Sequence, residues 1–192
     1  MIPDEQEIRA LVRRILMDVL DESDEGAMAD EPDATVSATP QTIAIASDHG
    51  GFELKQQLVS WLKTSGYRVI DLGTDSKESV DYPDFAFAAA RMVMQDKADA
   101  AIVIDGAGIG SAMAANKVPG VRASMCYDVA TARNAREHNH ANVLTLGAGM
   151  IDADLAKDIV KTWLETPWGG GRHARRVAKI TAIEQRFSKE NC

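Results

Sequence analysis

The chain has 192 residues, 45% of them hydrophobic, and a formal net charge of −8, which is enough for one well-packed domain with an appendage. Residues 1–41 hold 11 acids and three arginines, whereas residues 42–192 hold 18 acids and 18 bases. The even balance of charges in residues 42–192 argues against a nucleic-acid-binding surface. The two cysteines lack metal-ligand spacing and favour a reducing compartment. No apolar segment approaches the ~20 residues that a membrane span needs. We therefore expect a soluble, cytoplasmic protein that binds neither nucleic acid nor membrane.

The first part of the chain predicts a helix on a tether. Residues 21–41 contain seven acids and two prolines but few large apolar side chains, the composition of a flexible linker. A short amphipathic helix ahead of such a linker docks onto its own domain, another subunit or a separate protein, and all three remain open here. Within residues 1–20 the aliphatic residues that form one helical stripe are Ile8, Leu11, Val12, Ile15, Leu16, Val19 and Leu20.

From residue 42 onward, candidate strands alternate with candidate helices. Most of the strands are continuous apolar runs, which is typical of a parallel sheet buried on both faces. Residues 42–192 therefore predict one α/β domain, a three-layer α/β/α Rossmann-like fold with a five-stranded parallel sheet. The strands are expected at 42–47, 67–72, 100–105, 121–126 and 142–147, and the helices at 51–65, 84–95, 110–117, 128–138, 152–165 and 173–187.

The end of the third predicted strand combines an acid with a glycine-rich loop. Asp105 closes an apolar run and is followed by Gly106, Gly108 and Gly110, in the region where open parallel sheets bind ligands. A carboxylate beside free backbone N–H groups suits proton abstraction next to a carbonyl, because the N–H groups can hold the enolate oxygen. An ordinary turn with an acidic helix cap is the competing interpretation.

Two further pairs of polar residues follow strands or helices. Asp48 and His49 come after the first strand, where they could hold sugar hydroxyls or a phosphate, or could cap a helix and face solvent. His138 and His140 lie between the fourth predicted helix and the fifth predicted strand. Either could carry protons or could simply end a helix.

Near the C-terminus, the segment GGGRHARR places Arg172 and Arg176 four residues apart. On a helix they would share one face and could bind a phosphate with forked donors, although a solvated basic turn is the alternative. A dinucleotide site is disfavoured, because Ser111 stands where the third glycine of the Rossmann fingerprint belongs and no acid follows about 20 residues later at a strand end. We expect no cofactor and no metal.

Taken together, the motifs from about residue 42 to 187 resemble the type B ribose-5-phosphate isomerase family, which includes galactose-6-phosphate and allose-6-phosphate isomerases. No single motif is decisive, but their order along the chain is specific. The segments that carry the resemblance are SDHGGFELK at 47–55, VIDLGT at 69–74, VDYPDFA at 80–86, GAGIG and AANKVPGVRA within 106–123, AREHNHANVLTLGAG at 135–149, and GGRHARRVAKI at 170–180.

The resemblance implies a cofactor-free homodimer or tetramer whose active sites are shared between subunits, and aldose–ketose isomerisation of a phosphorylated sugar through a cis-enediolate. It also implies roles for individual residues. His138 would open the sugar ring, Asp48 and Asn139 would hold substrate hydroxyls, the loop of Gly106, Ala107, Gly108 and Gly110 would stabilise the enediolate, and His49, Arg172 and Arg176 would contact the phosphate.

The chain departs from the family pattern at four site positions. Asp105 stands where many members have the cysteine base, Ser111 where another branch has a glutamate, Ala107 where a hydroxyl side chain is common, and Gly149 where many have a phosphate-binding arginine. We expect isomerisation of ribose 5-phosphate to ribulose 5-phosphate with Asp105 as the base. The alternative is a non-catalytic or substrate-shifted member that binds a sugar phosphate or serves in assembly.

The leader also carries a resemblance. Residues 1–20 with the linker at 21–41 are similar to the encapsulation peptides that recruit enzymes into bacterial microcompartments. This resemblance implies a shell protein as the partner of residues 1–20 and a location inside a microcompartment.

Overall fold

The computed structural model describes Ala10 and residues 40–189. The chain divides into two units, Met1–Asp33 and Ala34–Cys192, and the fold described below belongs to the second. Apart from Ala10, the predicted leader helix at residues 1–20 lies outside the described residues, as does most of the predicted linker at 21–41. Among the described residues, no helix is long and apolar enough to cross a membrane.

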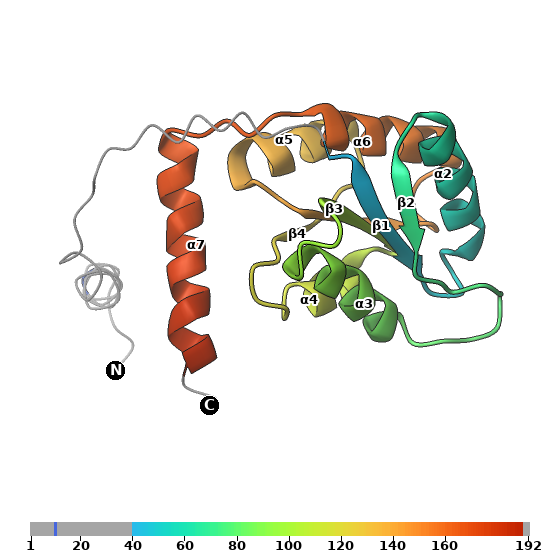
Figure 1. Cartoon of the computed structure of the whole chain (residues 1–192), viewed down its shortest axis with the longest axis horizontal. Helices are drawn as coiled ribbons and strands as arrows, with labels where there is room; N and C mark the ends of the chain where they lie inside the picture. Colours follow the sequence, from blue (N-terminus) through green and yellow to red (C-terminus); the bar gives the residue numbers. More distant parts are fainter. Residues whose placement is uncertain (1–9, 11–39, 190–192) are drawn as a thin grey trace. The chain divides into compact units, whose positions relative to one another are not determined.

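A five-stranded sheet forms the centre of the fold, with all strand pairs parallel and the order β2-β1-β3-β5-β4 (Figure 1). This confirms the predicted three-layer α/β/α arrangement. The strands are β1 (Thr42–Ser47), β2 (Arg68–Asp71), β3 (Ala100–Asp105), β4 (Ala123–Met125) and β5 (Val143–Gly147), and the helices are α2 (Phe52–Thr64), α3 (Tyr82–Met94), α4 (Ile109–Ala115), α5 (Val129–Asn139), α6 (Ala153–Glu165) and α7 (Arg172–Lys189).

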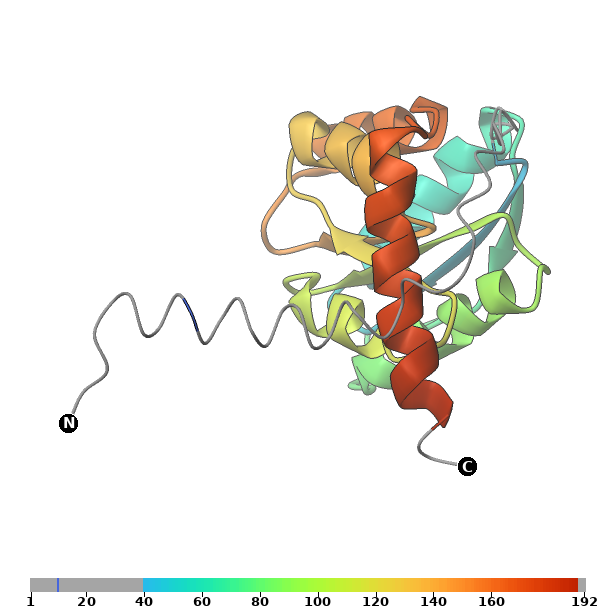
Figure 2. The same ribbon diagram turned by 90° about the vertical axis from the view of Figure 1, so that its left-hand side faces the viewer.

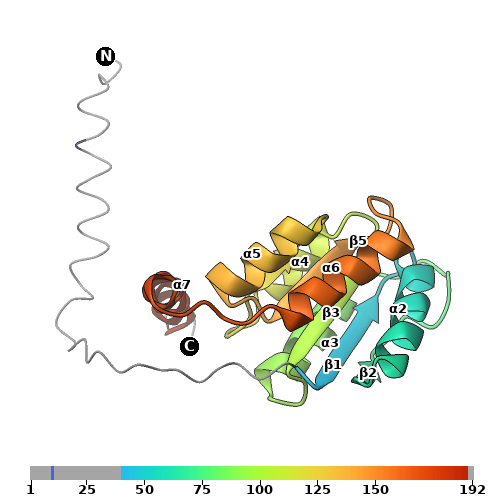
Figure 3. The ribbon, with the colours of Figure 1, turned by 90° about the horizontal axis from the view of Figure 1, so that it is seen from above.

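The two faces of the sheet bury side chains of different size. Because neighbouring residues of a strand point to opposite faces, β1 sends Ile43 and Ile45 to one side and Ala44 and Ala46 to the other. The side with isoleucines and leucines packs against α2, α5 and α6, the layer seen from above in Figure 3. The opposite side is mostly alanine and valine, and it packs against α3 and α4.

The C-terminal helix α7 has little contact with this sandwich. It stands beside the sheet rather than on either face (Figure 2), and in its first turns His173 and Val177 are buried. Farther along, the carboxylate of Glu184 accepts a hydrogen bond from the Gly120 N–H at 2.9 Å. The large apolar side chains that α7 leaves exposed are Ile180, Ile183 and Phe187.

Candidate active site

Backbone hydrogen bonds join the loops at the carboxyl edge of the sheet. At the end of β1, Ser47 bonds to two residues of the loop after β2: its N–H donates to Gly73 O, and its carbonyl accepts from Thr74 N, both at 2.7 Å. Asp48 N donates to Ile104 O at 3.1 Å, and Gly149 N donates to Gly106 O at 3.0 Å. The segments that follow β1, β2, β3 and β5 therefore form one connected surface, as the parallel fold predicts.

Asp105 is 5% exposed, and its carboxylate turns into its own loop. Oδ1 accepts hydrogen bonds from the N–H groups of Ala107, at 2.8 Å, and of Gly108. Oδ2 accepts from Ser111 twice, from N at 3.0 Å and from the hydroxyl at 2.5 Å. Two carboxylate oxygens offer about four lone-pair positions, so these four donors occupy all of them.

The same contacts change which loop amides are open to a substrate. The N–H groups of Ala107 and Gly108 were expected to face an enediolate, but they donate to Asp105. Among the described residues, no acceptor is found for the N–H groups of Gly106, Ile109 and Gly110. Because the first N–H groups of a helix have no partner inside it, Ile109 and Gly110 at the start of α4 keep free donors beside the carboxylate.

Close backbone packing sets the shape of this loop. Gly108 has a φ of +80°, which glycine adopts without strain, and its carbonyl accepts a hydrogen bond from the buried hydroxyl of Thr145 at 2.8 Å. A Cβ atom on Gly147 would stand 2.6 Å from the carbonyl of Ala107. Strand β5 therefore presses directly on the loop, and a side chain at position 147 would displace it.

Two residues of this surface were missed by the sequence reasoning. A Cβ on Gly110 would lie 2.6 Å from Cζ of Tyr82, so the phenol ring at the start of α3 covers the loop. Thr145, the second, supports the loop from β5. The VDYPDFA motif contained the signal for Tyr82, whereas Thr145 lies in an apolar strand and gave none.

Asp48 and His49 lie on the same surface. Oδ1 of Asp48 accepts hydrogen bonds from the N–H groups of Gly50, at 2.9 Å, and Gly51, at 3.0 Å, so this side chain orders the turn into α2 with one oxygen. His49 is exposed, and its Nδ1 lies 3.2 Å from both the nitrogen and the oxygen of Val80. The imidazole is thereby fixed against the loop that precedes α3.

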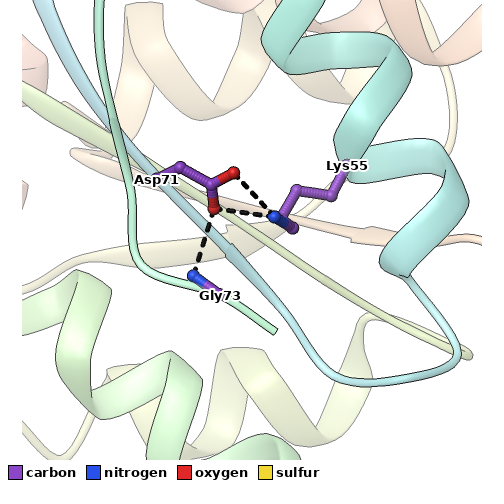
Figure 4. Close-up of polar contacts among 3 residues, drawn as sticks. All are labelled: Lys55, Asp71 and Gly73. Atoms are coloured by element: carbon purple, nitrogen blue, oxygen red, sulfur yellow. Dashed lines mark hydrogen bonds and ion pairs between the residues drawn. The ribbon is translucent and has the colours of Figure 1, made fainter. Parts of the chain in front are cut away.

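A partly buried ion pair ties α2 to the loop after β2 (Figure 4). Lys55 is 1% exposed, and its Nζ lies 2.7 Å from each carboxylate oxygen of Asp71. Oδ1 of Asp71 also accepts a hydrogen bond from Gly73 N at 3.1 Å. The pair therefore positions the segment whose backbone bonds to Ser47, next to Asp48.

The remaining predicted site residues gather at the other edge of the sheet. His138 and Asn139 end α5, which leads into the start of β5, and Arg172 begins α7. The ring of His138 stacks on that of His173, with centroids 4.2 Å apart and an interplanar angle of 5°. Arg172, Arg176 and Asn139 are exposed, so this group offers cations, an amide and an imidazole to a ligand.

The strand register separates the two groups. Val143, at the start of β5, pairs with Ala101, whereas Asp105 pairs with Gly147 at its end. Four residues of strand span about 13 Å, and His138 precedes Val143. Within one chain, His138, Asn139, Arg172 and Arg176 therefore do not meet Asp48, His49 or Asp105.

The surroundings of His173 lower the pKa of its imidazole. Burial lowers the pKa of His173, and the neighbouring His138, Arg172 and Arg176 lower it further, partly offset by Glu137. Arg172 Nε also lies 3.5 Å from His173 Nε2, which favours a neutral ring there. Among residues 40–189, no group of three or more His, Cys, Asp or Glu side chains is arranged to hold a metal ion.

The fold defines an α/β protein, and carboxylates and glycine-loop amides lie together at the carboxyl edge of its parallel sheet, where such folds bind ligands. The ribose/galactose isomerase family model matches residues 43–180. Ribose-5-phosphate isomerase B of Escherichia coli is 46% identical over 144 residues, which cover 75% of this chain and 97% of that protein.

Solved structures agree with the family match. The structure of ribose-5-phosphate isomerase B from Clostridium thermocellum shares 52% identity and a TM-score of 0.75, covering 76% of this chain and 99% of that one. The enzyme of the same name from Mycoplasma genitalium, with bound ribulose 5-phosphate, shares 42% identity and a TM-score of 0.73, covering 75% and 96%. The chain belongs to the ribose/galactose isomerase family, and it is a sugar-phosphate isomerase.

Proposed function

We propose that this chain interconverts ribose 5-phosphate and ribulose 5-phosphate through a cis-enediolate. The observation that carries the proposal is the carboxylate of Asp105 beside the N–H groups of Gly106, Ile109 and Gly110, which find no acceptor among the described residues. A base next to fixed donors is what proton transfer between C1 and C2 of a sugar requires, since negative charge develops on the adjacent oxygen. The relatives named ribose-5-phosphate isomerase B support this substrate.

The functional unit of the proposal is a homodimer with two shared sites. One chain presents Asp48, His49 and Asp105 at the carboxyl edge and His138 and Arg172 at the amino edge. A second copy related by a two-fold axis can bring its amino-edge group over the first copy's carboxyl edge, and the reverse contact then forms automatically. The exposed apolar side chains of α7 offer surface for such an interface.

In this site, the phosphate binds His49 of one subunit and Arg172 and Arg176 of the other. His138 moves the proton that opens the sugar ring, aided by Asn134, whose amide nitrogen lies 2.9 Å from its Nδ1. Asp48 and Asn139 hold sugar hydroxyls. Gly106 lies beside the oxygen of the enediolate. Gly108 and Gly110 shape its loop, and Ala107 stands at the exposed tip.

The proposed role of Asp105 as a base requires one lone pair to become available. Three of its four donors are backbone N–H groups, which the loop holds in place. The fourth is the Ser111 hydroxyl, which can rotate about its own Cα–Cβ bond. Turning this hydroxyl away exposes Oδ2 to the substrate, while the three amides keep the carboxylate oriented.

A substrate-shifted isomerase is the second candidate, and Gly149 favours it. This exposed residue borders the loop, with its N–H on Gly106 O, and a Cβ there would lie 3.0 Å from the same oxygen. The absence of a long side chain at position 149 leaves room for a larger sugar. Allose 6-phosphate and galactose 6-phosphate, with one more carbon than ribose 5-phosphate, are the substrates to compare.

The test measures isomerisation of these three sugar phosphates by the full-length protein and two variants. We expect turnover of ribose 5-phosphate, and a loss of about 10²- to 10⁴-fold in kcat for Asp105→Asn, the range for removal of a general base. Ser111→Ala is the matched control, because it breaks one loop bond but keeps the carboxylate, and it should retain most of the activity. Saturable binding without turnover of any sugar, or an unimpaired Asp105→Asn variant, contradicts the proposal.

A further inference from the structure

A cavity of about 750 Å³ opens at the amino-terminal edge of the sheet. It lies between the segments that enter β1, β3, β4 and β5. Three of its lining residues are basic: Arg122 before β4, Arg136 on α5, and His140 after α5. None of the residues assigned above to the sugar phosphate lines this cavity.

Both arginines are held by the end of α5. Nη1 of Arg136 donates to Ala141 O at 2.7 Å, and Nε of Arg122 donates to His140 O at 2.9 Å. Arg136 is 4% exposed, and its guanidinium lies over the Trp163 ring at 4.8 Å. Its Nε has no hydrogen-bond partner among the described residues. Helix-end carbonyls thus fix two guanidinium groups beside each other and leave donors unused.

In the part of the chain that the structure describes, these two cations have no carboxylate at ion-pair distance. Within residues 40–189, no Asp or Glu oxygen forms an ion pair with Arg122 or Arg136. Two acids line the cavity, Asp96 and Asp99. Asp99 accepts hydrogen bonds through Oδ2 from Gln41 N and Thr42 N, and Asp96 is exposed. Glu184, outside the lining, accepts a hydrogen bond from Gly120 N. Like charges that are partly buried without a counterion repel each other at a substantial free-energy cost.

The pKa values of Arg122, Arg136 and His140 are all lowered in this cavity. Burial lowers the pKa of Arg136, and the neighbouring Arg122 lowers it further. The pKa of His140 is likewise lowered, first by burial and then by both arginines. Burial also lowers the pKa of Arg122, with Glu184 offsetting part of the effect. Each group is therefore in surroundings that a bound anion would improve.

We propose that Arg122, Arg136 and His140 form a phosphate-binding site that is separate from the sugar-phosphate site. Forked guanidinium donors match the oxygens of a phosphate group, and the imidazole of His140 adds a donor when protonated. The cavity is wide enough for a phosphorylated metabolite as well as for inorganic phosphate. In this site the ligand would bring negative charge to two arginines that form no ion pair within residues 40–189.

The test introduces a carboxylate into the cavity, where its negative charge takes the place of the phosphate's. His140 has a φ of +49°, a conformation that Asp and Asn tolerate better than most residues, so His140→Asp places a carboxylate beside the arginines and His140→Asn is the neutral control. Both are made in a full-length Arg172→Ala, Arg176→Ala background, which weakens phosphate binding at the proposed active site. Binding of inorganic phosphate is measured by calorimetry and by the shift in Tm, with sodium chloride at equal ionic strength as the reference.

We expect inorganic phosphate to raise the Tm of the background protein, as a ligand that binds the native state does. His140→Asp should raise the Tm without phosphate and weaken phosphate binding by about 10- to 100-fold, the effect of losing a charge-assisted contact. His140→Asn should keep most of the binding. Repeating the titration with ribose 5-phosphate distinguishes a metabolite from the free ion as the preferred ligand.

Three results overturn the proposal. The background protein responds equally to chloride and to phosphate, which means ionic screening only. Phosphate binding is unchanged in His140→Asp, which places the anion elsewhere. His140→Asn and His140→Asp lose binding equally, which means that the imidazole, and not the uncompensated arginines, recruits the ion. Because none of these readouts is turnover, they are independent of the proposed isomerase activity.

Discussion

At the scale of single residues, the backbone conformation of His140 places its imidazole where the charged form is disfavoured. It occupies the left-handed region at the end of α5, and its ring stacks on Trp168 with centroids 4.7 Å apart. That position holds the imidazole near Arg122 and Arg136, so its charged form is disfavoured twice, by lost hydration and by repulsion. The native state therefore binds a proton at this residue less readily than the unfolded chain.

The sign of the pH dependence follows from this shift. Because the pKa of His140 is lowered on folding, the unfolded state takes up more protons, and stability declines as the pH is lowered through about 6.5. His173 adds a contribution of the same sign. Urea unfolding between about pH 8 and pH 5.5 should show this decline, and His140→Asn should make it shallower. An identical slope in the variant would contradict the assignment.

At the scale of elements, the Lys55 and Asp71 pair determines how α2 meets the loop after β2. Its two members differ in exposure: the Lys55 side chain is 1% exposed and the Asp71 side chain 32% exposed. Loss of the lysine leaves a carboxylate that water can reach. Loss of the carboxylate leaves an ammonium group buried without a counterion, which is the costlier situation.

We therefore expect unequal losses of stability from the two single substitutions. Asp71→Asn should lower the free energy of unfolding by about 3 to 5 kcal/mol, the range for an orphaned buried charge, and Lys55→Met should lower it by clearly less. Chemical denaturation of both variants, with Lys77→Met at an exposed ion pair as the reference, measures the difference. A larger loss in Lys55→Met would refute this account of the pair.

Most of the fold could be predicted from the sequence because its strands are buried apolar runs. The predicted ranges of β1 and β3, which have partners on both sides, agree with the structure at both ends. The edge strands β2 and β4 are shorter than predicted, since each forms a ladder on one side only. An apolar run indicates burial but does not show where an edge ladder stops.

The site could be predicted less completely, because contacts between side chain and backbone depend on loop conformation. The sequence placed Asp105 beside glycines, but its inward turn depends on the positive φ of Gly108 and on Ser111 reaching Oδ2. In the same way, Arg122 and Arg136 are 14 positions apart in the sequence, and the end of α5 brings them together. Spacing alone identifies neither contact.

At the scale of the whole molecule, the proposed dimer follows from the separation of two residue groups along the strands. A direct test uses heterodimers purified by two different tags, with Asp105→Asn in one chain and Arg172→Ala plus Arg176→Ala in the other. One of the two shared sites is then intact, so each heterodimer should have about half of the wild-type activity. Heterodimers no more active than the parent variants would rule out sharing of the sites.

The different sizes of the side chains on the two faces of the sheet determine which core substitutions the protein tolerates. Where α3 meets the sheet, alanines lie on both sides, among them Ala86, Ala89, Ala44 and Ala46, so an added methylene finds no free space. On the other face, isoleucines and leucines can exchange volume with their neighbours. Variants recovered from random mutagenesis should therefore concentrate core substitutions under α2, α5 and α6, and leave the alanine face almost invariant.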